Sequence, residues 1–283
     1  KRDYSFISTE KIDDAGMASF SGSGNVAFGK FYAGISAERV WSPNRFDYEF
    51  NGMKLSRENA HFNRSFISVS AGYTGKSTAI DLYSNYGFYQ AGVPGFVVSN
   101  NTSSSGATNT TEGTLTILRL STAIAENSGL EASLGFSHQR LNFDDPNRAY
   151  YKVNGADNST LNNLSFNAKS WLKLGSVTLS GGYGFEGGEL DDIKTVLSNY
   201  RKESFVKRRV NRLLAKIDWE PAILPEVFAG LFITGGVNGE FFSQKGIGER
   251  NKNGINWNGG LSFAPAGFDR LRLKFNYFST NRI

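Results

Sequence analysis

Residues 164–185 read LSFNAKSWLKLGSVTLSGGYGF, and this stretch decides the fold. Apolar and polar residues alternate on both sides of a short break at residues 173–175. Because successive side chains of a strand point to opposite faces, the pattern predicts a β-hairpin of two long strands. A soluble sandwich would bury the apolar face, whereas a membrane barrel would turn it toward lipid and keep the polar face around water. The rest of the chain decides between these two architectures.

The composition of the 283-residue chain excludes several classes of protein. Apolar residues make up 39% of the sequence, and no run approaches the roughly 18 apolar residues that a membrane helix needs. Helical membrane proteins are thereby excluded, but barrels are not, since their strands are apolar only at alternate positions. The 32 glycines, 6 prolines and 14% aromatic residues suit long strands joined by tight turns. The sequence has no cysteine, which excludes disulfides, thiol catalysis and cysteine metal sites.

The net charge of +5, from 31 Lys and Arg against 26 Asp and Glu, is modest. It is compatible with anionic partners such as lipopolysaccharide, although charged loops and a charged lumen in water explain it more simply. The chain begins at Lys1 without a signal peptide and stops at Ile283 within an alternating pattern. We therefore expect the sequence to be a piece of a longer protein.

The connections between the predicted strands favour the membrane barrel. Short turns are expected at residues 28–30, 74–76, 126–129, 173–175, 220–225 and 265–269. They alternate with long polar stretches, expected as loops at about 42–63, 89–113, 142–163, 186–212 and 244–253. Outer-membrane barrels have short turns at one rim and long loops at the other, whereas sandwiches mix their loop lengths. Aromatic residues near the predicted strand ends fit interfacial girdles: Trp41, Tyr73, Phe88, Tyr183, Trp219 and Tyr277.

The alternating pattern places about thirteen strands, of which the first, at residues 4–9, is the shortest. Bacterial single-chain barrels have an even number of strands, because both ends of the chain lie on one side of the membrane. The odd number and the abrupt ends predict an all-β, antiparallel transmembrane β-barrel that is only partly contained in this chain, with about 12–13 strands present.

Three short motifs occur in order along these strands. Residues 44–60 contain NRFDYE followed by RENA, residues 86–95 contain YGF followed by GVPG, and residues 271–283 contain LRLKFNY followed by NRI. The three resemble an early barrel segment before an R-E-N-A-D stretch, an R-G-V-P-G loop start and a strand leading into F-R-A-P-T-F-N-E-L-Y. Those segments belong to TonB-dependent outer-membrane receptors, in particular the vitamin B12 and siderophore transporters. The resemblance extends over most of the chain.

The resemblance implies a barrel of about 22 strands plugged by an N-terminal globular domain. It also implies location in the bacterial outer membrane and contact with outer-membrane lipid. Extracellular loops and plug would bind a small-molecule substrate, and TonB would pull on the plug to open a path. The expected substrate is a scarce nutrient, namely a metal chelate, cobalamin or a glycan. Residues 1–283 are expected to be a single partial barrel domain, with the plug, the TonB box and the last strands outside this sequence.

Candidate site residues come from the predicted loops and from the polar face. The loop positions expected to contact substrate are Asp47, Tyr48, Phe88, Tyr89, Val93, Asp144, Asp145 and Tyr150. The basic residues expected on the inner face, toward the plug or lumen water, are Arg119, Lys169, Lys216, Arg272 and Lys274. The basic run at residues 207–209, with Arg212, has two interpretations. It contacts lipid phosphates or an anionic substrate, or it is a strand extension that stands in water.

No catalytic set stands out in the sequence. The two histidines, His61 and His138, are far apart, and neither a Ser-His-acid set nor a pair of catalytic carboxylates is recognisable. The acidic pairs at 144–145 and 191–192 are candidates for calcium, although they lack the regular donor spacing of calcium loops. We therefore expect a protein without enzymatic activity, without a resident cofactor and without a nucleic-acid partner.

Two other functions stay open at this point. A passive outer-membrane channel or lipid transporter of roughly 14 strands would require a nearly complete chain and a constricting segment inside the barrel. A structural or adhesive barrel would bind surfaces with its long loops and transport nothing.

Overall fold

The computed structural model describes residues 2–12, 16–44, 46–50, 52–57, 59–93, 97–98, 101–102, 106–146, 155–197, 200–221, 228–246, 249–265 and 273–279. Within these residues all regular structure is β-strand, and no helix is long and apolar enough to cross a membrane. Thirteen strands form one continuous antiparallel sheet. The prediction of an all-β antiparallel fold with about thirteen strands is therefore confirmed.

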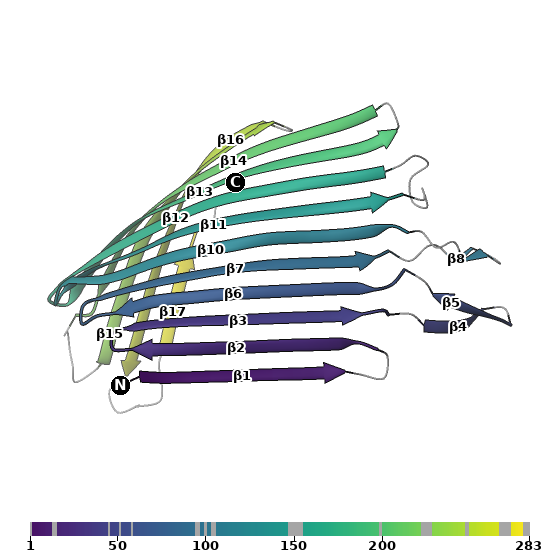
Figure 1. Cartoon of the computed structure of the whole chain (residues 1–283). Helices are drawn as coiled ribbons and strands as arrows, with labels where there is room; N and C mark the ends of the chain where they lie inside the picture. The colour runs from purple at the N-terminus through teal and green to yellow at the C-terminus, as the bar shows by residue number, and fades with distance from the viewer. Residues whose placement is uncertain are drawn as a thin grey trace.

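The sheet strands follow one another in chain order. They are β1 (Arg2–Ile12), β2 (Ala18–Phe28), β3 (Phe31–Ser42), β6 (Phe62–Thr74), β7 (Thr78–Gly92), β10 (Thr108–Ala125), β11 (Ser128–Asp145), β12 (Gly155–Leu174), β13 (Val177–Leu197), β14 (Tyr200–Trp219), β15 (Phe228–Gly246), β16 (Arg250–Pro265) and β17 (Leu273–Phe278). Two small hairpins lie outside the sheet: β4 (Phe46–Phe50) with β5 (Met53–Arg57), and β8 (Val97–Val98) with β9 (Asn101–Thr102). In Figure 1 strands β1 to β14 cross the front and β15 to β17 continue behind them, so the sheet curves into part of a barrel.

The hairpin predicted at residues 164–185 is the pair β12–β13. Its turn is made by residues 175–176, and Gly175 has a φ of 60°, a conformation that costs glycine little. Phe166 pairs with Phe185, and Ala168 pairs with Tyr183, so the apolar residues of the two strands share one face. The rings of Phe166 and Tyr183 lie 6.2 Å apart, centre to centre.

The outer face of the sheet carries an apolar band. Leu134 on β11 and Leu164 on β12 are 46% and 45% exposed, and Leu213 and Ile217 on β14 are 51% and 53% exposed. On β12 the band runs from residue 164 to residue 174, about 33 Å along the strand at ~3.3 Å per residue. A strand tilt of about 40° reduces this length to a height of ~25 Å, the height of the lipid-facing band of an outer-membrane barrel. A soluble sandwich would have covered these side chains with a second layer.

From β2 to β13, short and long connections lie at opposite ends of the sheet. Residues 29–30, 75–77, 126–127 and 175–176 make tight turns at one end, which we call the turn end. Residues 43–61, 93–107 and 146–154 connect strands at the other end, the loop end, and hairpins β4–β5 and β8–β9 project from it (Figure 1). In outer-membrane barrels the short turns face the periplasm and the long loops face outward. By the layout of such barrels, the loop end corresponds to the extracellular side.

For two of the predicted long loops the prediction is wrong, because strands leave only two or three connecting residues there. Strand β13 continues to Leu197 and β14 begins at Tyr200, although residues 186–212 were predicted as a loop. Only residues 247–249 separate β15 from β16, within the loop predicted at residues 244–253. Above the apolar band both faces of a strand contact water, so the alternation disappears while backbone pairing continues. Cross-strand pairs such as Glu189 with Lys207 hold this extension together.

The aromatic residues expected in girdles occupy different heights. At the turn end the rings of Phe31 and Tyr73 lie 5.1 Å apart. Trp219 is the last residue of β14 and lies at the same end. Tyr183 instead lies in the middle of the apolar band, and its hydroxyl donates a hydrogen bond of 2.8 Å to Asn211 Oδ1. For Tyr183 the girdle prediction is therefore wrong.

Candidate functional site on the concave face

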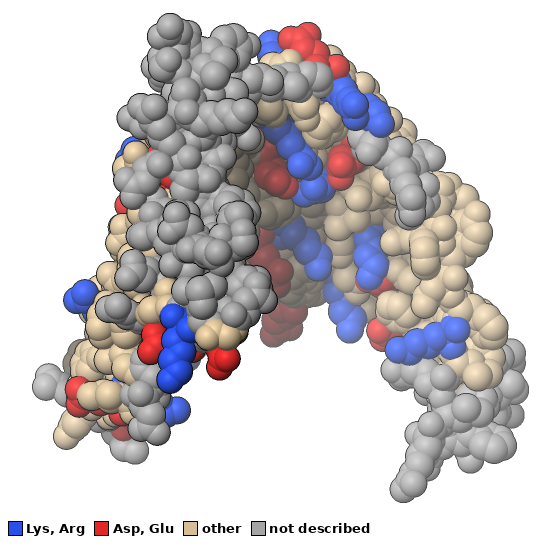
Figure 2. Space-filling view, turned by 90° about the vertical axis from the view of Figure 1, so that its right-hand side faces the viewer, with Lys and Arg blue, Asp and Glu red and all other residues tan. Residues whose placement is uncertain are grey.

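The register of the sheet decides which side chains share its concave face. Residues paired directly across antiparallel strands point to the same side. One row, which we call the charged row, runs across seven strands through Asp81, Arg119, Ser133, Asn167, Gly184, Arg212 and Glu240. Figure 2 shows the hollow side of the molecule, with basic and acidic side chains gathered on its inner wall. The outer face at the same height carries the apolar band.

A cavity of about 530 Å³ lies against the charged row. Arg119, Lys169 and Arg212 contribute cations to its lining, and Asp81 and Glu131 contribute carboxylates. Serine and asparagine side chains fill the positions between them: Ser121, Ser133, Asn167 and Asn238. The wall therefore offers donors and acceptors of both charges, with three cations and two carboxylates.

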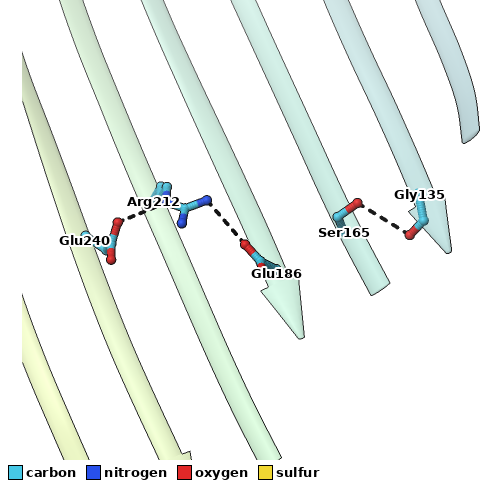
Figure 3. A network of polar contacts seen from close by, with 5 residues as sticks. All are labelled: Gly135, Ser165, Glu186, Arg212 and Glu240. Carbon is cyan, nitrogen blue, oxygen red and sulfur yellow. Dashed lines mark hydrogen bonds and ion pairs between the residues drawn. The ribbon is translucent and has the colours of Figure 1, made fainter. Parts of the chain in front are cut away.

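Arg212 lies between two carboxylates on neighbouring strands (Figure 3). Its Nε donates a hydrogen bond of 3.0 Å to Glu240 Oε2 on β15, and its Nη1 lies 3.5 Å from Glu186 Oε2 on β13. Two strands further along, Ser165 Oγ donates a weak 3.5 Å hydrogen bond to the carbonyl oxygen of Gly135 (Figure 3). The Arg212 side chain is 42% exposed, so each ion pair contributes little, about 1 kcal/mol or less. The two ion pairs mainly hold the Arg212 guanidinium at a fixed place in the wall of the cavity.

Tyr32 and Gly72 position the carboxylate of Asp81. A Cβ atom on Gly72 would lie 2.4 Å from the Tyr32 ring, so the ring lies flat over the glycine. The Tyr32 hydroxyl crosses to β7 and donates a hydrogen bond to Asp81 Oδ1. Asp81 pairs directly with Arg119 on β10. The absence of a side chain at residue 72 thus allows β3 to reach across β6 to the charged row.

A second polar cluster lies toward the turn end. Lys216 Nζ lies 2.8 Å from Asp218 Oδ2, and Thr234 Oγ1 donates a hydrogen bond of 2.7 Å to Asp218 Oδ1. Thr234, Lys274 and Asn276 line a further cavity of about 670 Å³ between β15, β16 and β17. The concave face is therefore polar from the charged row down to its turn end.

The structure distributes the predicted basic residues along this face. Arg119 and Lys169 line the same cavity, Lys216 belongs to the cluster at the turn end, and Lys274 lines the cavity beside β17. Arg272 lies outside the described residues.

The predicted loop residues do not form one site. Phe88 and Tyr89 lie within β7, not in a loop, and Tyr89 pairs with Arg64 on the concave face while Phe88 points to the other face. Asp47 and Tyr48 lie in β4, where Asp47 is exposed. Asp144 and Asp145 end β11, and Asp145 is fully buried. Tyr150 lies outside the described residues.

Two of the sequence motifs meet at the loop end. Asn59, from RENA, donates hydrogen bonds of 3.0 Å to the carbonyl oxygen of Val93, from GVPG, and of 2.7 Å to that of Ala107. The Val93 amide also donates a 2.8 Å bond to the Ala107 carbonyl, and Ala107 is fully buried. We call these contacts the Asn59 clamp. It joins the connection between β3 and β6 to the connection between β7 and β10.

Several residues of the charged row and its surroundings were missed by the sequence analysis as site residues: Tyr32, Asp81, Glu131, Glu186 and Glu240. The alternation that selected the basic residues places these carboxylates on the same face, so the signal was present. The Asn59 clamp had no such signal, because its partners are two backbone carbonyls that lie 34 and 48 residues away.

The acidic pairs considered for calcium lie on strands. In the pairs 144–145 and 191–192 the two carboxylates point to opposite faces, because neighbouring strand residues alternate. Asp192 accepts a hydrogen bond of 2.6 Å from Ser159. Among the residues that the structure describes, no three His, Asp or Glu side chains form a metal-binding group. Calcium binding stays a prediction.

Comparison with known proteins finds similar structures but no similar sequence family. No family model and no curated protein matches the sequence. The structure is similar to that of the copper transporter OprC, with a TM-score of 0.68 and 13% identity, over 94% of this chain and 43% of OprC. It is also similar to the FrpB iron transporter of Neisseria meningitidis, F3-3 variant, with a TM-score of 0.68 and 16% identity, over 94% of this chain and 45% of FrpB.

The alcaligin outer-membrane receptor FauA from Bordetella pertussis matches with a TM-score of 0.56 and 12% identity, over 93% of this chain and 41% of FauA. The chain thus spans less than half the length of each of these three proteins. The fold expected from the sequence motifs is confirmed: the chain has the fold of part of a TonB-dependent outer-membrane receptor barrel.

Proposed function

We propose that this chain is part of an outer-membrane receptor that imports a scarce nutrient by TonB-dependent active transport. The observation that carries the proposal is a curved sheet of thirteen strands with a charged concave face and an apolar outer band. A barrel of about eight strands fills its interior with its own side chains, whereas wider barrels enclose water or a plug. A barrel of thirteen strands or more is therefore wide enough to hold a plug domain.

The nature of the wall supports a plugged lumen over a simple selective pore. Rings of a single charge make a pore selective for ions of the opposite sign. Here Arg212 lies between Glu186 and Glu240, and the cavity lining contains both cations and carboxylates. Such a balanced surface fits a polar protein domain that must dock and slide, and we expect the plug of the longer protein to contact it.

A metal or metal chelate is the substrate class best supported. OprC is named a copper transporter, FrpB an iron transporter and FauA an alcaligin receptor. Cobalamin and glycans remain within the proposal as alternatives of the same mechanism. The substrate would first meet the loop end, where the Asn59 clamp sets the positions of two connections.

Energy dependence is the property that tests this function. The full-length protein is produced in a bacterial strain without its own metal-chelate receptors, and uptake of radiolabelled ferric and cupric chelates is measured with and without a proton uncoupler. We expect saturable uptake of one chelate class that stops when the uncoupler is added. Entry of many small solutes at a rate that the uncoupler does not change would instead show a passive channel.

A further inference from the structure

Between the charged row and the loop end, two neighbouring strands carry glycine at the same height of the concave face. Gly87 on β7 pairs directly with Gly113 on β10, as Asp81 pairs with Arg119. Each glycine is six residues from its charged-row neighbour on the same strand, and an even spacing places both on the same face. At ~3.3 Å per residue the glycine pair lies about 20 Å nearer the loop end. We call this pair the glycine floor.

A cavity of about 570 Å³ opens over the glycine floor. Phe66, Leu115 and Leu161 contribute apolar side chains to its lining, and Tyr89 contributes a second aromatic ring. A Cβ atom on Gly87 would have the Phe66 ring 3.8 Å away and no other neighbour within 4 Å, so the space over this glycine is open. Sites for small molecules typically have volumes of roughly 300–1,000 Å³ and a mainly apolar lining with a few polar groups. The cavity has this size and this kind of lining.

The polar groups of the lining suit a ligand without net charge. Arg64 and Glu38 form an ion pair with each other at one edge of the cavity, so neither charge is left unpaired. Gln139 pairs with Gly113 across the strands, and its amide has both donors and an acceptor. Within the described part of the chain, no hydrogen bond is found for the Gln139 amide or the Tyr89 hydroxyl. A ligand that enters the cavity can therefore bond to these two groups.

We propose that this cavity is a subsite for a flat aromatic ring carried by the substrate, and that Gly87 and Gly113 determine this specificity. Two glycines side by side leave a surface on which a ring can lie with its whole face. The Phe66 ring at the side of the floor offers the offset or edge-to-face contact that aromatic rings prefer. The inference rests on the proposed import function and adds to it a substrate class, namely metal chelates whose chelating groups carry aryl rings.

The test compares two ferric complexes that differ only in the ring. Ferric tris(benzohydroxamate) and ferric tris(acetohydroxamate) have the same metal, the same oxygen donors and no net charge, but the first carries phenyl groups where the second carries methyl groups. Their dissociation constants are measured by isothermal titration calorimetry with the full-length protein in a neutral detergent. We expect the phenyl complex to bind about tenfold more tightly, because a buried ring removes more apolar surface from water than a methyl group does.

Gly87→Val fills the space over the floor, and Gly235→Val is its matched control. Gly235 also lies inside a strand, nothing lies within 4 Å of its Cβ position, and it pairs with Ile217 on the outer face. Valine suits the interior of a strand, so both variants should fold. We expect Gly87→Val to reduce the preference for the phenyl complex to below about threefold, and Gly235→Val to leave the preference within about twofold of that of the natural protein.

Three results would overturn the proposal. Equal affinities of the natural protein for the two complexes would mean that no ring subsite exists, and uptake of either complex that stops with the uncoupler would show that the import function still holds. An unchanged phenyl preference in Gly87→Val would mean that the ring binds elsewhere. No phenyl preference, together with a lower urea midpoint for Gly87→Val than for Gly235→Val, would mean that the protein's own plug fills the cavity. A phenyl preference that Gly87→Val removes would support the subsite even if the uncoupler left uptake unchanged, and only the import function would then fail.

Discussion

At the scale of single residues, Gly72 shows how a missing side chain can shape a polar wall. The Tyr32 ring occupies the space that a Cβ would take, and its hydroxyl reaches Asp81 across an intervening strand. The glycine is not needed for a special backbone angle here. It is needed because another residue lies on top of it.

Gly72→Ala tests this arrangement. The added Cβ would push the Tyr32 ring away and break its hydrogen bond to Asp81. We expect the variant to lose about 1.5–3 kcal/mol of stability, the value of a hydrogen bond to a charged group. The measurement is the midpoint of urea unfolding in detergent. Gly235→Ala is the control, because nothing lies within 4 Å of its Cβ position. Equal midpoints for the two variants would contradict the account.

At the scale of elements, the Asn59 clamp is the contact that joins two loop-end connections. Asn59 has a φ of 56°, a left-handed conformation that asparagine adopts more readily than most residues. Its side-chain amide donates to the carbonyl oxygens of both Val93 and Ala107. A single side chain therefore closes the base of the connection between β7 and β10.

Asn59→Ala should loosen that connection without unfolding the sheet. We expect limited proteolysis to cleave between β7 and β10 several times faster, because local opening exposes the chain there. Cleavage sites are identified by mass spectrometry. Asn127→Ala is the control, since Asn127 also donates to one backbone carbonyl, that of Lys173 at 3.0 Å, but at the turn end. Unchanged cleavage in Asn59→Ala, or an equal change in the control, would show that the clamp does not set the loop.

The elements that sequence patterns predict well are those with one face in lipid. The β12–β13 hairpin was predicted because lipid and water impose opposite demands on alternate residues. The upper halves of β13 and β14 were predicted as a loop because both of their faces meet water, and nothing in the residue pattern then distinguishes a strand from a loop. Backbone hydrogen bonds, which carry no side-chain signature, continue the sheet.

The candidate site was predictable only in part, for a similar reason. Arg119 and Lys169 were assigned to the inner face from alternation, and they line one cavity in the structure. Their position in one cavity depends on the register between β10, β11 and β12, which the pattern of a single strand does not determine. The substrate-binding role of the loop positions stays a prediction, and Tyr150 lies outside the described residues.

At the scale of the whole molecule, one sheet separates two solvents. Its outer face carries an apolar band about 25 Å high, as lipid requires. Its concave face carries charged pairs such as Arg212 with Glu240, as a water-filled or plugged lumen requires. The central claim is therefore about orientation: odd-numbered residues in the lower half of β14 face lipid, and even-numbered ones face the lumen.

Placing the same charge at two neighbouring residues of β14 tests this claim most directly. Leu213 pairs with Tyr183 in the middle of the apolar band, and Leu214 lines the charged cavity. The free energy of unfolding is measured for Leu213→Arg and Leu214→Arg after folding of the full-length protein into phosphatidylcholine vesicles. We predict a loss of about 2–4 kcal/mol for Leu213→Arg, the cost of arginine at the bilayer centre, and a loss below about 1 kcal/mol for Leu214→Arg. Equal losses, or the larger loss at Leu214, would contradict the account.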